Sequence, residues 1–145
     1  MSVTMKALPL VASMLGNKLG VKVVIGSSDT ACTNGDTIFL PPLPVDDEGV
    51  LYPLVSGFID HEAAHIRHTD LTVLKGKMLT PIEKYLWNAI EDWRVEHEII
   101  KRYPGCHEHF IWLIRHFFVK DTETEKAGES DSPAFSVLNY VLLTL

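Results

Sequence analysis

Two histidines and a glutamate between positions 60 and 65 have the types and the spacing for metal chemistry. His61 and His65 are four residues apart, so on a helix both side chains lie on one face and can bind one metal ion. Glu62 stands beside the first histidine, where a carboxylate can take a proton from a metal-bound water. This His-Glu-x-x-His pattern is typical of zinc-dependent peptidases, and it predicts peptide hydrolysis with Glu62 as the general base.

The helix that must carry this motif is predicted over residues 51–69. Its other side is apolar, as packing on a core requires, and consists of Leu54, Val55, Phe58, Ile59, Ala63 and Ile66. A plainer interpretation is a core helix with two hydrogen-bonded histidines and an exposed glutamate. We favour the metal site, because a second segment offers the ligand that such a site still needs.

A catalytic zinc needs a third protein ligand and one position open for water. Segment 88–96 offers two adjacent carboxylates, Glu91 and Asp92. On a helical wheel Glu91 falls on a charged face that we expect to be solvated, whereas Asp92 falls on a less charged flank. Glu96 follows Asp92 by four residues and can accept the Nδ1–H of a ligand histidine. The wheel therefore favours Asp92, with Glu91 as the alternative because glutamate is the commoner third ligand.

The same wheel predicts a buried stripe for this helix, made of Leu86, Ala89, Ile90, Trp93, His97 and Ile100. Three further polar side chains are candidates to orient the site or to stabilise an oxyanion. His68 lies three residues after His65, where it could also be a ligand, and Tyr85 and Arg94 belong to the second helix. The sequence does not rank these three.

Composition narrows the classes of function. The 145 residues are 46% hydrophobic and 22% charged, which predicts one globular domain. The net charge of -6 and the scattered basic residues argue against nucleic-acid binding. No stretch is long enough to span a membrane, and the apolar N-terminal stretch is interpreted as a core helix rather than a signal peptide. Cys32 and Cys106 lack metal-type spacing, so we expect two free thiols in a cytoplasmic protein.

The remaining elements must position the two site helices. Residues 7–19 predict an amphipathic helix, with Pro9 near its first turn and Gly20 as its stop. Segments 21–25 and 36–40 predict two strands, and the Asn-Gly turn between them indicates that they pair antiparallel.

The second half of the chain predicts helices. Thr80 and Pro81 are typical of a helix start and predict a helix to about Arg102. Another helix follows over residues 107–119. We expect a flexible acidic loop over 120–132 and a C-terminal helix over 133–145, which either docks on the core or leads into a further domain. The predicted fold class is α+β, mostly helical, with a small antiparallel sheet.

Three blocks of the sequence, 33–41, 61–70 and 88–96, carry a resemblance to a known family. The chain resembles the zincin-like metallopeptidase domains called cobaltochelatase T-subunit-like, which occur in bacteria and their phages. The resemblance covers residues from about 5 to 119 and implies a zincin-like core over 1–119 with one Zn²⁺ per chain.

The resemblance also implies how a substrate would bind. The strand with Thr37, Ile38 and Phe39 would be the edge strand above the cleft, where an extended peptide substrate can add. Domains of this family often precede a von Willebrand A-type domain, which does not fit in these residues, so we expect a piece of a longer protein. Two rival functions stay open: a catalytically silent metal-binding interaction module, and a chelatase-assembly subunit.

Overall fold

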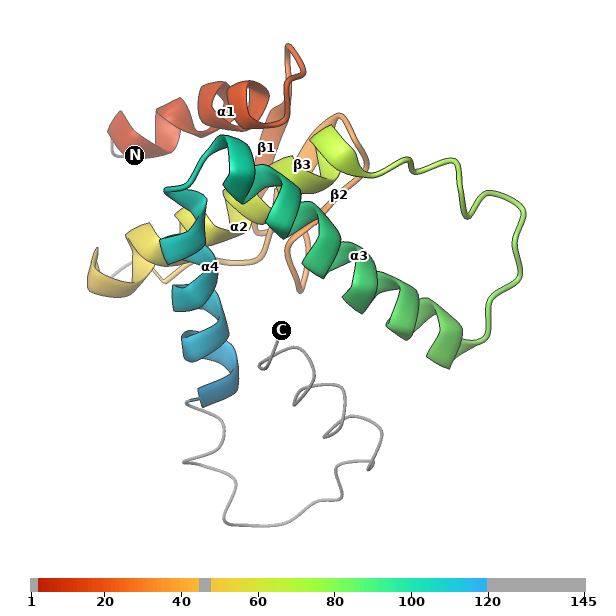
Figure 1. Cartoon of the computed structure of the whole chain (residues 1–145). Helices are drawn as coiled ribbons and strands as arrows, with labels where there is room; N and C mark the ends of the chain where they lie inside the picture. The colour runs from red at the N-terminus through yellow and green to blue at the C-terminus, as the bar shows by residue number, and fades with distance from the viewer. Residues whose placement is uncertain (1–2, 45–47, 120–145) are drawn as a thin grey trace.

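The computed structural model describes residues 3–44 and 48–119, and these form an α+β fold that is mostly helical. The helix Glu48–His68 (α2) lies at the centre (Figure 1). It packs against three other helices, Val3–Leu15 (α1), Pro81–Arg102 (α3) and Cys106–Ile114 (α4), and against a small sheet. The expected loop 120–132 and helix 133–145 lie outside the described residues.

The sheet is mixed, not antiparallel. Its strands Lys22–Ile25 (β1), Cys32–Thr33 (β2) and Thr37–Leu40 (β3) stand in the order β1-β3-β2. The expected Asn-Gly turn is present, with Gly35 at φ +92°, but it joins β3 to β2 in the antiparallel pair. The strand β1 pairs with β3 in parallel. The turn was therefore predicted correctly, but the strand that it pairs with β3 is β2 and not β1. The sequence analysis missed β2 because this strand has only two residues.

This order overturns the expected substrate edge strand. Thr37, Ile38 and Phe39 belong to β3, which has β1 on one side and β2 on the other. Both sides of the β3 backbone are thus already paired, and no extended peptide can add there. Ile38 is also fully buried in the core. The edge of the sheet on this side is β2.

The first helix begins and ends four residues earlier than the pattern predicts. It ends because Asn17 adopts a left-handed conformation at φ 53°. The N–H of Lys18 donates to the carbonyl of Ser13, and the N–H of Asn17 donates to the carbonyl of Met14. These two bonds form a Schellman motif, which asparagine allows. Pro9 consequently lies inside the helix and not in its first turn.

The helix α3 has the predicted bounds, because its start is determined by local chemistry. The Thr80 side chain accepts from the N–H of Glu83, and the Glu83 carboxylate accepts from the N–H of Thr80. Such a capping box satisfies two backbone donors that a helix start leaves free. Pro81 occupies the first position, where its missing N–H costs nothing.

Two buried clusters hold α2 in place from two sides. One joins α1, the sheet and α2, through Leu8, Ala12, Val21, Ile38, Leu40, Val55 and Ile59. The other joins α2 to α3 and α4, through Leu15, Ala63, Ala64, Val95, Ile99, Cys106 and Phe110. At Gly57 the helices α2 and α4 approach so closely that an added Cβ would lie 2.5 Å from Cγ of Leu113. The position of the metal motif is therefore set by packing on both sides of its helix.

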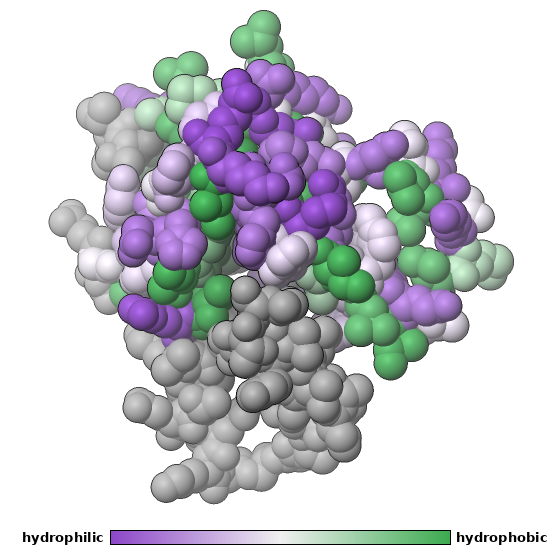
Figure 2. All heavy atoms as spheres, in the orientation of Figure 1, coloured by the Kyte–Doolittle hydropathy of each residue, from purple (hydrophilic) through white to green (hydrophobic). Residues whose placement is uncertain are grey.

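The buried stripe expected for α3 is largely wrong. Ala89 is buried as predicted, but the other buried residues are Val95 and Ile99. Leu86, Ile90 and Trp93 are exposed, because only the second half of α3 packs on the core. Apolar side chains show at the surface of the arm formed by residues 69–80 and the first half of α3 (Figure 2).

The last described segment is not one regular helix as predicted. The predicted helix 107–119 is α4, Cys106–Ile114, followed by a π-helical turn over Arg115–Val119 (η1). None of the described helices has the length and apolar character needed to cross a membrane.

Candidate metal centre

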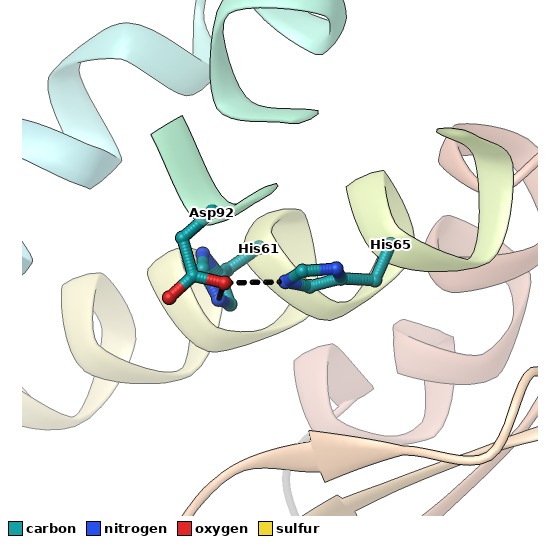
Figure 3. A group of neighbouring side chains, drawn as sticks. All are labelled: His61, His65 and Asp92. Carbon is teal, nitrogen blue, oxygen red and sulfur yellow. Dashed lines mark ion pairs between the residues drawn. The ribbon is translucent and has the colours of Figure 1, made fainter. Parts of the chain in front are cut away.

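Three side chains from two helices converge on one point (Figure 3). His61 and His65 come from one face of α2, and Asp92 comes from α3. The Nε2 atom of His65 lies 3.0 Å from Oδ1 of Asp92, and the Nε2 atom of His61 lies 3.9 Å from the same oxygen. One ligand atom from each residue lies within 4.8 Å of the other two.

The donor set and its spacing fit a zinc ion. In a tetrahedral zinc site with bonds of about 2.0 Å to nitrogen and oxygen, two ligand atoms lie about 3.3 Å apart. The distances from Asp92 to the two histidines bracket this value. Two imidazoles and one carboxylate are also a known ligand set for catalytic zinc, which keeps a fourth position for water. The three residues would hold the ion, and no further protein ligand is needed.

His61 is oriented by Glu96, the contact that the sequence analysis expects of that glutamate. Nδ1 of His61 lies 2.8 Å from Oε1 of Glu96. Because an ionised carboxylate only accepts, Nδ1 carries the proton and donates it, which leaves Nε2 free to bind a metal ion. Burial lowers the pKa of His61, but the carboxylates of Glu96, Glu62 and Asp92 outweigh it and raise the pKa to about 9.

His65 is oriented by a chain of contacts that the sequence analysis missed. Its Nδ1 lies 2.9 Å from Oγ1 of Thr69, and that hydroxyl donates to Oε1 of Glu91 at 2.8 Å. Since the only hydroxyl proton goes to the carboxylate, the Thr69 oxygen must accept from Nδ1–H of His65. Nε2 of His65 is therefore also left free to bind a metal ion. The signal was present in the sequence, because Thr69 follows His65 by four residues on the same helical face.

Glu91 is not the solvated surface charge that the helical wheel predicts. Its side chain is only 12% exposed. It accepts from the Thr69 hydroxyl and from two nitrogens of Arg94, at 2.8 and 2.6 Å. The Arg94 guanidinium lowers the pKa of Glu91, which keeps the acceptor ionised. Glu91 thus lies behind His65 and reaches it through Thr69, whereas Asp92 is one of the three converging side chains.

Glu62 is buried beside the two histidines, with 4% of its surface exposed. Burial raises the pKa of its carboxyl group and outweighs the neighbouring imidazoles of His61 and His65, which lower it, while the charge on Asp92 raises it further. The net direction is upward. A carboxylate with a raised pKa is a stronger base than an ordinary glutamate.

The three remaining candidates, Arg94, His68 and Tyr85, are not among the three converging side chains. Arg94 donates to Glu91 and to the carbonyl of His68, so it fixes the end of α2 to α3. Nε2 of His68 is buried and has no hydrogen-bond partner in the described part of the chain, and burial lowers the pKa of this imidazole. Tyr85 lies on α3 about two turns before Asp92. None of the three is among the described residues that line the adjoining cavity.

A second polar cluster fixes α2 to α4 directly beside the motif. Asp60 is buried, and its Oδ2 lies 2.6 Å from Nδ1 of His109. The thiol of Cys106 also forms a hydrogen bond with this carboxyl group. Burial raises the pKa of Asp60, and burial together with the Asp60 charge raises the pKa of Cys106 to about 12.

A cavity of about 880 Å³ opens beside the three ligands. Its described lining includes His61, Glu62, Asp92 and Glu96, and it continues over the apolar side chains of α2, α4 and η1. Residues 29–31, which lead into the edge strand β2, line it as well. Glu62 and two of the candidate ligands, His61 and Asp92, therefore face a space that is large enough for a bound molecule.

Comparison of the chain with family models, with curated proteins and with solved structures finds no match in any of the three. The metal centre is therefore argued from its own geometry.

Proposed function

We propose that this chain is a zinc-dependent peptidase that hydrolyses peptide bonds in the cavity beside His61, His65 and Asp92. The observation that carries the proposal is the convergence of these three ligand atoms next to a buried glutamate at the wall of an 880 Å³ cavity. A purely structural zinc site is closed by four protein ligands, whereas this one offers three. We also propose that the chain is related to the cobaltochelatase T-subunit-like domains, on the strength of the three sequence blocks.

Bound zinc would act as a Lewis acid on the scissile carbonyl and lower the pKa of the attacking water. The chain's own residues supply the rest. Glu62 takes one proton from the water while the water oxygen attacks the carbonyl carbon. It then gives that proton to the leaving amine when the carbon–nitrogen bond breaks. Its raised pKa suits both halves of this transfer.

Glu96 and Thr69 keep the two imidazoles in the tautomer that presents Nε2. Glu96 lies on α3, and Thr69 directly follows α2. Both partners are therefore part of the packed helices, and the ligands are held in position before the ion binds. We place the reaction in the cytoplasm, since an exposed free thiol such as Cys32 persists in a reducing compartment.

The test combines metal content with turnover in the full chain. Zinc is measured by elemental analysis in wild type, His61→Ala and Glu62→Gln, and cleavage of an unstructured protein such as casein is followed by mass spectrometry. We expect about one zinc per chain in wild type and Glu62→Gln, none in His61→Ala, and cleavage by wild type alone. Glu108→Gln is the matched control, because Glu108 is an exposed glutamate on α4 and should leave both readouts unchanged.

One result would count against the peptidase and another against the role of Glu62. Zinc that binds without any cleavage would favour a catalytically silent metal-binding module, and a chelatase-assembly subunit would then be tested by pull-down with chelatase proteins. Cleavage that survives in Glu62→Gln would remove the general base assigned here.

A further inference from the structure

The cavity beside the candidate metal centre has a large apolar wall. Away from the ligands, it is lined by large apolar side chains from three elements, among them Leu54, Phe58, Phe110, Leu113 and Phe117. Phe110 is buried and meets the ring of His61 edge-on, with centroids 6.5 Å apart. Phe58 and Phe117 face each other across α2 and η1, with centroids 5.9 Å apart. The apolar wall thus begins at a ligand and continues away from it without a break.

The charges around the cavity disfavour acidic occupants. The ionisable groups in its described lining are the carboxyl groups of Asp29, Glu62, Asp92 and Glu96 and the imidazoles of His61 and His116, with no lysine or arginine among the described lining residues. An acidic side chain placed away from the candidate ligands would be repelled by these carboxylates and would find no lysine or arginine to pair with. Any charged group placed against the aromatic wall would also lose its hydration without a partner. An apolar side chain has no such hydration to lose, and its burial against this wall is favourable.

We propose that this cavity is the specificity pocket of the site and that it takes a large apolar side chain, aromatic or leucine-sized, directly beside the scissile bond. The inference rests on the proposed peptidase function and adds its substrate class. The volume of about 880 Å³ lies within the range of about 300–1,000 Å³ that small-molecule sites occupy, so it holds such a side chain together with adjoining backbone.

The first experiment maps cleavage sites. Zinc-loaded full-length chain is incubated with a proteome-derived peptide mixture, and the new termini are sequenced by mass spectrometry. One of the two positions flanking the cut should be enriched in Phe, Tyr, Leu, Met or Trp and depleted in Asp and Glu. The enrichment over Gly should be at least about tenfold, since single methylenes in an apolar pocket already discriminate by about 10- to 200-fold. Cleavage without an apolar preference would overturn the pocket and leave the peptidase standing.

Two variants connect the preference to this cavity. Ile114→Trp fills it from α4 and should shift the preference to smaller side chains, whereas Phe58→Leu enlarges it from α2 and should shift the preference to larger ones. The matched control is Ile82→Trp, the same change at an exposed position of α3 outside the cavity lining. Circular dichroism checks that each variant is folded. If both cavity variants fold and keep the wild-type preference, the assignment is wrong.

A binding measurement separates the pocket from turnover. Phenylalanine, glycine and aspartate hydroxamates share one zinc-binding group and differ in the side chain, and their affinities for the zinc-loaded chain are measured by calorimetry. Phenylalanine hydroxamate should bind at least about tenfold more tightly than the other two, and Ile114→Trp should abolish this advantage. That result in a chain that cleaves nothing would support the pocket while the peptidase fails. Equal affinities of the three hydroxamates would overturn the pocket.

Discussion

Nδ1 of His61 and Oε1 of Glu96 lie 2.8 Å apart, and this contact joins the motif helix to the helix that supplies the third candidate ligand. It fixes the imidazole tautomer and at the same time the spacing between α2 and α3. The same two helices are joined again by Arg94, which lies two residues before Glu96 on α3 and donates to the carbonyl of His68 at the end of α2. Two polar contacts therefore hold the candidate ligands of α2 and α3 in register.

We predict that Glu96→Gln weakens zinc binding by about 10- to 100-fold, the usual cost of removing a carboxylate behind a ligand histidine. The amide can still accept a hydrogen bond, but the charge that supports Nδ1–H is gone. Zinc affinity is measured by competition with a chromogenic chelator. Glu98→Gln is the control, because Glu98 lies on the same helix but pairs with Lys101 on the surface. An unchanged affinity in Glu96→Gln would show that the contact does not support the ligand.

A second prediction concerns the chain of contacts behind His65. Thr69→Val keeps the shape of the side chain and removes its hydroxyl, so Nδ1 of His65 loses its acceptor and Glu91 loses a donor. Zinc affinity should fall by about tenfold or more. Thr72→Val is the matched control, because Thr72 bonds only within the exposed loop after α2. Equal affinities of the two variants would contradict the role assigned to Thr69.

The elements that local chemistry determines could be predicted from the sequence. The capping box at Thr80 involves only neighbouring residues and determines where α3 begins, and the Asn-Gly pair determines the turn before β3. The shared face of His61 and His65 also followed from spacing, because residues four apart on a helix lie on one side, and the helical wheel favoured Asp92 over the alternative Glu91 as the third member of the group.

What could not be predicted depends on how the elements pack. The strand β2 has two residues, too few for a periodic signal, and its pairing makes β3 a central strand. The apolar stripe of Leu86, Ile90 and Trp93 reads as core, yet the first half of α3 extends away from the core. Glu91 reads as surface because the wheel contains no information about Thr69, which belongs to another segment. The cavity could not be predicted for the same reason, since its lining residues come from distant parts of the chain.

The two cysteines should react very differently with a thiol reagent. Cys106 is buried, and its pKa is raised to about 12, so at pH 8 only about one molecule in ten thousand carries the reactive thiolate. Cys32 is exposed. In the native protein at pH 8, Ellman's reagent should therefore label one thiol rapidly and the second only after unfolding. The Cys32→Ser variant isolates Cys106, whose labelling should accelerate as the pH rises toward 12. Rapid labelling of this variant at pH 8 would contradict the buried environment.

The close approach of α2 and α4 at Gly57 gives a stability prediction. An alanine at Gly57 would place its Cβ 2.5 Å from Cγ and 2.7 Å from Cδ1 of Leu113. Because Cγ is not the free end of the side chain, Leu113 must move as a whole or the helices must separate. We expect Gly57→Ala to lower the free energy of unfolding by about 1–3 kcal/mol, as overpacking usually does, measured by urea denaturation.

The matched control for this prediction is Gly105→Ala, just before α4. Gly105 has φ -62° and ψ -24°, which any residue adopts, and nothing lies within 4 Å of an added Cβ. That variant should be neutral or more stable by about 0.4–1 kcal/mol, because alanine restricts the unfolded chain. Leu113 also lines the cavity, so a folded Gly57→Ala protein should in addition bind phenylalanine hydroxamate differently from wild type. If both glycine variants unfold at the same urea concentration, the close packing of α2 on α4 at this point is not as described.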